Sequence, residues 1–153
     1  MSEERAAPPL LLDAMLGRLA RWLRLMGYDA AYLADTEDIV VVRVARAEGR
    51  LVLTRDRELA ARRAIRAVLI QSDRLEEQIE QVARDVGPPG EGGPRCAVCN
   101  VPLTPVEPES VRDRVPPYVW RTQRDFSECG RCRRVYWPGT HWAGFRAKLG
   151  EGG

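Results

Sequence analysis

Hydrophobic residues in the first half of the chain form short apolar runs that alternate with stretches of helical spacing. The runs predict strands over residues 10–13, 30–33, 51–54 and 67–70. Apolar residues three or four positions apart predict helices over about residues 16–26, 57–65 and 73–86. This regular alternation indicates an α/β fold, in which a parallel sheet is flanked by helices on both faces and the crossovers are right-handed.

The segment between the second and third predicted strands is compatible with two structures. Its valines at positions 40, 41, 42 and 44 favour a strand by intrinsic propensity. The length of the segment, residues 39–47, and the glycine at position 49 favour a helix that ends in a glycine cap. We predict a helix here.

A run rich in glycine and proline, GPPGEGGP at residues 87–94, interrupts all periodicity. The residues after it differ in character, because cysteines, prolines and aromatic residues replace the helical pattern. We therefore predict a tail at residues 1–9, an α/β domain at 10–87, a linker at 88–94, a small module at 95–145 and a final tail at 146–153.

Four cysteines form two close pairs, Cys96 with Cys99 and Cys129 with Cys132. Each pair can present two thiolates from one tight turn, and two such turns complete a tetrahedron around Zn²⁺. The alternative is a redox motif or free thiols, but a thioredoxin-like site needs one pair near a βαβ unit and not two pairs in a small module. Because four thiolates leave no open coordination position, the sequence predicts a structural zinc site.

Acidic residues follow three of the four predicted strands. Asp13 ends the first strand, Asp35, Glu37 and Asp38 follow the second, and Asp56 follows the third. Ligands of open parallel sheets bind at the carboxyl ends of the strands, and grouped carboxylates need a cation to offset their repulsion. This edge is therefore a candidate site for Mg²⁺ or Mn²⁺. The alternative is helix capping, because Asp38, Asp56 and Asp73 precede helices, whereas Asp13 fits that role least.

Three further residues near that edge are each compatible with two roles. Thr54 either positions a metal-bound water or caps the helix after the third strand. Arg18 and Arg21 either hold a phosphate backbone near the metal site or form a solvated face of the first helix.

Composition narrows the function only slightly. The formal net charge is +2, and all but one of the 24 cationic residues are arginines, a bias that suits phosphate contacts but that genomic base composition can also produce. The polar start of the chain does not resemble a secretory signal, and no segment has the length of a membrane span. The lack of both features, together with paired cysteines that fit a reducing compartment, predicts a cytoplasmic protein without a membrane partner. Glycine-rich phosphate loops and serine-hydrolase elbows are absent, and the single histidine, His141, excludes a two-histidine mechanism.

Several segments together resemble the Mut-seven C-terminal RNase family. They are LLLDAMLGRLARWLRLMGYD from residue 10, EGRLVLTRDREL from residue 48, LIQSD from residue 69, and CAVC with CGRCRRVYWPGTHW from residues 96 and 129. The resemblance covers nearly the whole chain, about residues 10–142. It implies a PIN-like nuclease domain followed by a zinc ribbon, and it supports a helix for the valine-rich segment. In that family a glycine often follows the second cysteine pair, where this chain has Arg133.

The resemblance also implies a function and a set of site residues. It implies a metal-dependent endoribonuclease with Mg²⁺ or Mn²⁺ on Asp13, Asp38 and Asp56, Thr54 beside Asp56, and Asp35 as a further candidate. Single-stranded RNA is the expected substrate, with Arg18 and Arg21 on its backbone. The mixture of arginine and aromatic residues from 131 to 142 suits single-stranded bases, or else forms a small core around the zinc. The alternative function is a non-catalytic RNA-binding or adaptor protein with the same fold, in which the acids are helix caps.

Overall fold

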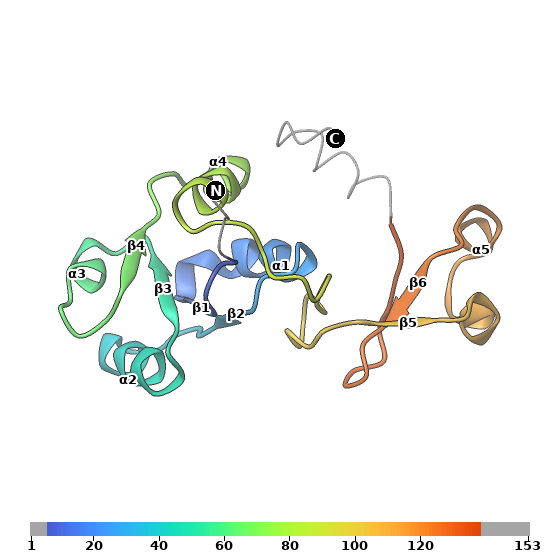
Figure 1. The fold of residues 1–153 in the computed structure, drawn as a ribbon, viewed down its shortest axis with the longest axis horizontal. Helices are drawn as coiled ribbons and strands as arrows, with labels where there is room; N and C mark the ends of the chain where they lie inside the picture. The colour runs from blue at the N-terminus through green and yellow to red at the C-terminus, as the bar shows by residue number, and fades with distance from the viewer. Residues whose placement is uncertain (1–5, 139–153) are drawn as a thin grey trace, which may run out of the picture.

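The structure, a computed structural model, describes residues 6–138 of the 153-residue chain (Figure 1). A parallel sheet with its helices is followed by a smaller antiparallel sheet, which confirms the predicted α/β architecture with a second, small module. The predicted division at residues 88–94 stays a prediction. His141, the end of the predicted module at 95–145 and the tail at 146–153 lie outside the described residues, as do the first residues of the tail at 1–9.

Four short strands form the first sheet in the order β2-β1-β3-β4, and every neighbouring pair is parallel. They are β1 (Leu10–Leu12), β2 (Ala30–Tyr32), β3 (Leu51–Thr54) and β4 (Ala67–Leu69). Each lies within a predicted strand. The central positions of β1 and β3 explain their continuous apolar sequences, since a central strand of a parallel sheet is covered on both faces.

Side chains of the central strands alternate between two hydrophobic cores, one on each face of the sheet. Leu10 and Leu12 lie in the core formed with α1 (Gly17–Leu25) and α4 (Leu75–Asp85). Leu11 and Val52 lie in the core formed with α2 (Asp38–Glu48) and α3 (Arg57–Ala60). Two helices therefore cover each face, as the alternating pattern predicted, and none of the described helices is long and apolar enough to cross a membrane.

The valine-rich segment is a helix, α2, which confirms the prediction from its length and its glycine. Gly49 follows the helix with φ 66°, a left-handed conformation in which glycine has no steric cost. Val41, Val42 and Ala45 of α2 are buried in the second core. Burial of this face outweighs the strand propensity of the valines, because that propensity mainly reflects packing context.

The helix after β3 is shorter than predicted. We predicted a helix over about residues 57–65, but α3 ends at Ala60. Residues 61–64 are all exposed, so a longer helix would present no apolar face to the sheet. The chain leaves the helix instead, and Ile65 packs on the second core just before β4.

The start of α4 also differs from the prediction, because Asp73 does not cap the helix. The residue at the N-cap position is Arg74, whose side chain makes no cap bond, and α4 begins at Leu75. Ser72 organises this turn: its hydroxyl accepts the backbone N–H of Arg74 at 2.9 Å and donates to the Glu77 carboxylate at 2.5 Å.

A buried glutamine of α4, Gln81, forms hydrogen bonds with the backbone at the end of the edge strand β4. The Gln81 side-chain amide donates to the carbonyl of Leu69 at 2.8 Å and accepts the backbone N–H of Gln71 at 2.9 Å. Gln81 is only 5% exposed. Its amide therefore pairs with backbone groups that would otherwise lie unpaired at the edge of the sheet.

We expect Gln81→Leu to lower the free energy of unfolding by about 1–3 kcal/mol, because both backbone groups lose their partner in a buried place. Chemical denaturation measures the difference. Glu80→Gln, an exposed neighbour on the same helix, is the control and should unfold like wild type. Equal unfolding energies for Gln81→Leu and wild type would show that the amide contributes nothing to the edge.

The second sheet is antiparallel, in the order β5-β6-β7. Its strands are β5 (Thr104–Val106), β6 (Phe126–Glu128) and β7 (Val135–Tyr136), and between β5 and β6 lie the 3₁₀ helix η2 (Pro108–Arg114) and α5 (Pro117–Thr122). A small core of its own includes Val111, Val119 and Phe126. Figure 1 shows this sheet on the far side of α1 from the parallel sheet.

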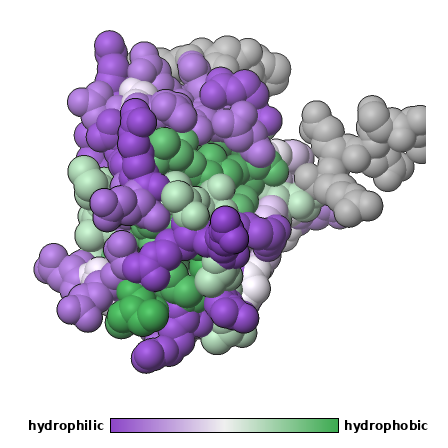
Figure 2. All heavy atoms as spheres, turned by 90° about the vertical axis from the view of Figure 1, so that its left-hand side faces the viewer, coloured by the Kyte–Doolittle hydropathy of each residue, from purple (hydrophilic) through white to green (hydrophobic). Residues whose placement is uncertain are grey.

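The outer face of the parallel-sheet unit carries α2, α3 and β4. Figure 2 shows hydrophobic side chains on this face between hydrophilic ones. β4 is an edge strand, and each of its three residues is half-buried. So short an edge offers little backbone for pairing with another chain.

Candidate metal sites

Thr54, the last residue of β3, joins two of the predicted acids. Its hydroxyl donates to Asp13 Oδ2 and accepts the backbone N–H of Asp56 at 2.9 Å. Thr54 is completely buried. Because β1 and β3 are neighbours with Leu12 opposite Leu53, the residues that follow the two strands meet at the same edge of the sheet.

Only one oxygen of the Asp13 carboxylate forms a hydrogen bond within residues 6–138. Asp13 Oδ1 is buried and has no hydrogen-bond partner among the described residues. Asp13 stands at the N-cap position of the 3₁₀ helix η1 (Ala14–Leu16), but its side chain makes no cap bond. A buried carboxylate oxygen without a partner carries a desolvation cost that a bound cation would offset.

Asp56 does cap a helix, as the alternative interpretation expected. Its Oδ1 accepts the backbone N–H groups of Glu58 at 2.8 Å and Leu59 at 3.3 Å at the start of α3. Both bonds use the same oxygen. The cap therefore fixes the orientation of the carboxylate and leaves Oδ2 for another partner.

The acids after β2 occupy two different positions. Asp38 is half-buried in the first turn of α2, whereas Glu37 holds the N-cap position without a side-chain cap bond. Asp35 is exposed, and its φ of 51° lies in the left-handed region. Within residues 6–138, the cysteines are the only group of three or more potential ligands whose atoms lie within 4.8 Å of one another. The acids follow strands that end at this edge, but the described residues bring no three of them together in this way.

The arginines of α1 fall into two kinds. Arg18 and Arg21 are exposed, and neither forms an ion pair in the part of the chain that the structure describes. Arg24 is half-buried and donates to the carbonyls of Ala30 at 2.7 Å and Ala97 at 2.8 Å. Burial lowers the pKa of Arg24, and the positive charge of Arg21 acts in the same direction. Arg18 and Arg21 remain available to a ligand, whereas Arg24 serves the structure.

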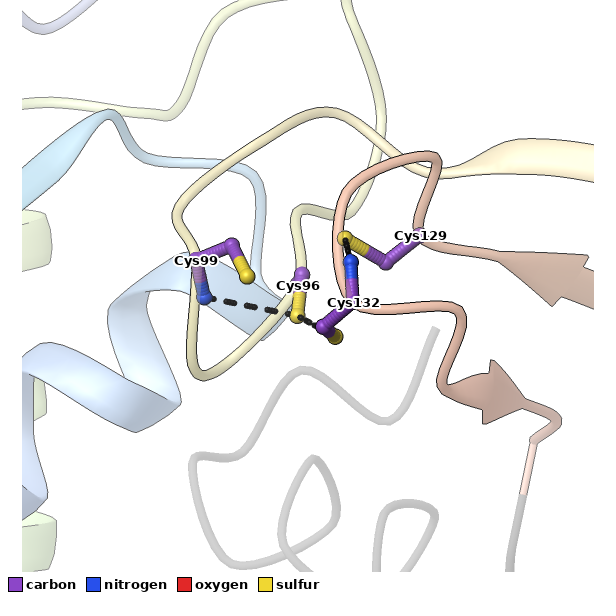
Figure 3. Close-up of side chains that lie close together, drawn as sticks. All are labelled: Cys96, Cys99, Cys129 and Cys132. Atoms are coloured by element: carbon purple, nitrogen blue, oxygen red, sulfur yellow. Dashed lines mark hydrogen bonds between the residues drawn. The ribbon is translucent and has the colours of Figure 1, made fainter.

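The four cysteines point toward one another (Figure 3). Their sulfur atoms all lie within 4.8 Å of each other, and Cys96 Sγ and Cys132 Sγ are 3.7 Å apart. Four sulfurs bound to Zn²⁺ at 2.3 Å in a tetrahedron would be about 3.8 Å apart. The cluster therefore has the donor atoms and the size for a four-coordinate zinc ion.

Each cysteine pair is held in a turn of the same kind. The residue after each pair, Asn100 or Arg133, is left-handed with φ 63° and 70° respectively. Backbone N–H groups in the turns donate to sulfur, for example Cys99 to Cys96 at 3.4 Å and Arg131 to Cys129 at 3.3 Å. A left-handed position of this kind favours glycine, so Arg133 occupies it at a steric cost.

The thiols of the cluster differ in acidity. Hydrogen bonds from the backbone and side chain of Arg134 lower the pKa of Cys132 to about 6. Burial, together with hydrogen bonds among the thiols, raises the pKa of Cys99 to about 12. Closely packed thiolates oppose one another's ionisation, and a divalent cation at their centre would remove that opposition.

Comparison with protein families agrees with this arrangement. The Mut7-C RNAse domain matches residues 8–149 of the sequence. The chain belongs to the Mut7-C RNase family. No curated protein and no solved structure matches it. The matched range includes Asp13, the acids after β2 and both cysteine pairs, so the resemblance inferred from the motifs is confirmed.

In this Mut7-C chain the turn of the first cysteine pair, Cys96 and Cys99, forms hydrogen bonds with the parallel sheet and the loop before it. Asp29 Oδ1 accepts from Asn100 Nδ2 at 2.7 Å and from Arg50 at 2.9 Å. Asn100 Oδ1 accepts the backbone N–H of Ala30 at 3.1 Å, on the edge strand β2. The contacts of Arg24 with Ala97 reinforce this docking. Sequence reasoning missed these residues, because their partners are distant in the chain and only the asparagine after a cysteine pair gave a signal.

The charge of the Asp29 carboxylate strengthens its contact with Asn100 and Arg50. Burial works to raise the pKa of Asp29, but the Arg50 guanidinium and the Asn100 amide hold it below the ordinary value of 3.8. A carboxyl whose pKa is lowered by folding stabilises the folded state above its unfolded pKa. The stabilising effect of Asp29 is therefore present near neutral pH and is lost as the pH falls below 3.8 and through the lowered pKa.

We expect Asn100→Gly to loosen the docking without disturbing the turn, because glycine accepts the left-handed conformation but has no amide. The amide proton of Ala30 should then exchange with solvent at least about tenfold faster, since it loses its acceptor. Hydrogen exchange by NMR measures this, with Val98→Ser, an exposed residue of the same turn, as the control. An unchanged exchange rate at Ala30 in Asn100→Gly would contradict the docking role.

Proposed function

We propose that the protein is a metal-dependent endoribonuclease that hydrolyses RNA phosphodiester bonds at a carboxylate site for Mg²⁺ or Mn²⁺. Membership of the RNase family supports RNA as the substrate. The observation that carries the proposal is Asp13. Its buried Oδ1 has no partner among the described residues, and Thr54 ties it to a second carboxylate.

Each site residue has a role in this proposal. Asp13, Asp38 and Asp56 would hold the cation, with Asp35 as a further candidate. A divalent cation bound there would supply an acidified water molecule and stabilisation of charge on the attacked phosphate. Thr54 fixes Asp13 Oδ2 with its hydroxyl, so that the remaining oxygen is held in place. The cap bonds of Asp56 likewise fix the orientation of its carboxylate.

Arg18 and Arg21 would bind the backbone of single-stranded RNA. α1 begins one 3₁₀ turn after Asp13, so its exposed arginines lie on the helix that leads away from the acids. Guanidinium groups bind phosphate oxygens in a bidentate way and place the chain without reading its sequence.

The four cysteines would hold a structural zinc ion. Their spacing, as measured between Cys96 and Cys132, fits a tetrahedral site, and four thiolates leave no position for catalysis. The docked first turn then connects the zinc site to the sheet that carries the acids. The cytoplasmic location expected from the paired cysteines remains a prediction.

A non-catalytic RNA-binding protein is the second candidate function. The observation that favours it is the cap formed by Asp56, because a capping acid needs no metal to explain its position. Cap formation does not explain Asp13, whose side chain caps nothing. The nuclease therefore accounts for more of the structure.

The deciding experiment is cleavage of an end-labelled single-stranded RNA in EDTA, Mg²⁺ and Mn²⁺. We expect internal cuts only with a divalent ion, with 5′-phosphate and 3′-hydroxyl ends. A protein that keeps its fold and its zinc, and binds the RNA but never cuts it, would instead support the non-catalytic alternative.

A further inference from the structure

An apolar cleft lies where the end of α1 meets the antiparallel sheet. Its volume is about 410 Å³, within the range of small-molecule sites. Leu25 lines it from α1, and Leu103, Tyr136 and Trp137 line it from the module that carries the cysteines. Two polar residues, Asp125 and Ser127, also line the cleft.

We propose that this cleft binds a nucleobase of the RNA substrate, and that the base is guanine. The inference rests on the proposed ribonuclease function and adds a base-specific site to it. Its support comes from the aromatic walls of the cleft, from the two polar side chains, and from the arginines that lead to it.

The aromatic walls are fixed before any ligand binds. Trp137 packs edge-on against Phe126 of the small core, with ring centroids 6.3 Å apart and planes at 62°. The hydroxyl of Tyr136 contacts Cys96 Sγ at 3.1 Å and accepts the backbone N–H of Ala97 at 3.0 Å. Tyr136 lies opposite Ser127 in the sheet, so its side chain is on the same face as that hydroxyl. A ring held there can stack on an unpaired base without further ordering, which is how proteins commonly bind single-stranded RNA.

The polar side chains select among the bases. Asp125 is exposed, and within residues 6–138 neither its carboxylate nor the Ser127 hydroxyl has a hydrogen-bond or ion-pair partner. An ionised carboxylate only accepts hydrogen bonds. Guanine alone offers two adjacent donors, N1–H and the 2-amino group, on its Watson–Crick edge. Adenine and cytosine place a ring acceptor beside their amino group, and uracil places its single N–H between two carbonyls. The Ser127 hydroxyl can donate to guanine O6.

The exposed arginines of α1 connect the cleft with the acids. Arg21 and Arg18 lie about one and two turns before Leu25, on the same side of the helix. From Gly17 to Leu25 the helix spans about 12 Å. An RNA strand that follows these arginines from Asp13 would reach the cleft a few nucleotides from the bond that is cut.

The experiment uses a series of oligoadenylate RNAs in which a single guanosine is moved one position at a time. We expect one position, a few nucleotides from the cut, to raise kcat/KM about ten- to a hundredfold over the guanosine-free RNA. Inosine at that position, which lacks the 2-amino group, should give an intermediate rate. The Asp125→Asn variant should reduce the guanosine preference to near one, because an amide replaces one acceptor by a donor. Asp113→Asn, an exposed acid of η2 that does not line the cleft, should leave rate and preference unchanged.

Equal kcat/KM for all positions, or an unchanged guanosine preference in Asp125→Asn, would overturn the proposal. The cleft would then belong to an occupant other than a nucleobase. Binding of the same RNAs in EDTA gives a second readout that needs no cutting: the favoured guanosine should lower Kd, and equal Kd values overturn the inference. Guanosine-dependent binding without cleavage in any metal would instead contradict the ribonuclease function alone, so the two failures are distinguishable.

Discussion

Asp13→Asn is expected to lower kcat for RNA cleavage at least about a hundredfold, because the metal that we propose for this carboxylate would supply several kcal/mol of transition-state stabilisation. The asparagine side chain keeps an acceptor for the Thr54 hydroxyl, so the local structure should survive. The variant also removes a charge from a buried oxygen that has no partner within residues 6–138. Its free energy of unfolding should therefore be unchanged or raised by about 1 kcal/mol.

Opposite effects on activity and stability distinguish a catalytic carboxylate from a structural one. Single-turnover cleavage in Mg²⁺ and Mn²⁺ measures the first, and chemical denaturation measures the second. Asp73→Asn, an exposed acid that follows β4, is the matched control and should match wild type in both. A variant Asp13→Asn that cuts RNA at the wild-type rate, or that loses activity only because it unfolds, would show that Asp13 does not hold the catalytic metal.

The sequence predicted those parts of the fold that depend on burial. β1 and β3 are central strands covered on both faces, as their continuous apolar runs indicated. The helix at α2 was predicted because Gly49 gave a local end signal that outweighed the valines. The predicted length of α3 was wrong: a helix was expected to run to Ile65, but it ends at Ala60 and residues 61–64 are exposed.

The candidate sites show the same division between local and distant signals. The cysteine pairs were evident from spacing, and the structure brings all four together. Asp13 stood out as an acid at the end of an apolar strand, but its unpartnered oxygen was visible only in the structure. The role of Arg24 was not predicted, because its spacing in the helix matched that of Arg18 and Arg21. Its partner at Ala97 lies 73 residues away, and no local pattern encodes such a contact.

Cys129→Ser is expected to abolish zinc binding and with it the folded state of the antiparallel sheet. Cys129 is fully buried, and its sulfur accepts the backbone N–H groups of Arg131 and Cys132. Structural zinc contributes about 10–16 kcal/mol to the folding of small modules, more than a core of this size can replace. Native mass spectrometry should show the loss of one zinc ion, and hydrogen exchange should show loss of protection in β5, β6 and β7.

The parallel sheet should respond to this variant in a graded way. Both hydrophobic cores of the parallel sheet consist of residues that precede the cysteines. The amides of β1 and β3 should therefore keep their protection from hydrogen exchange. The edge strand β2 depends on Asn100 for one of its backbone bonds, so the amide of Ala30 should exchange faster, as in Asn100→Gly. Val98→Ser, in the first cysteine turn but without a ligand atom, should retain zinc and full protection. Retained zinc in Cys129→Ser would contradict the four-cysteine site. Cooperative loss of protection in β1 as well would mean that the docking contact makes the two sheets a single unit of stability.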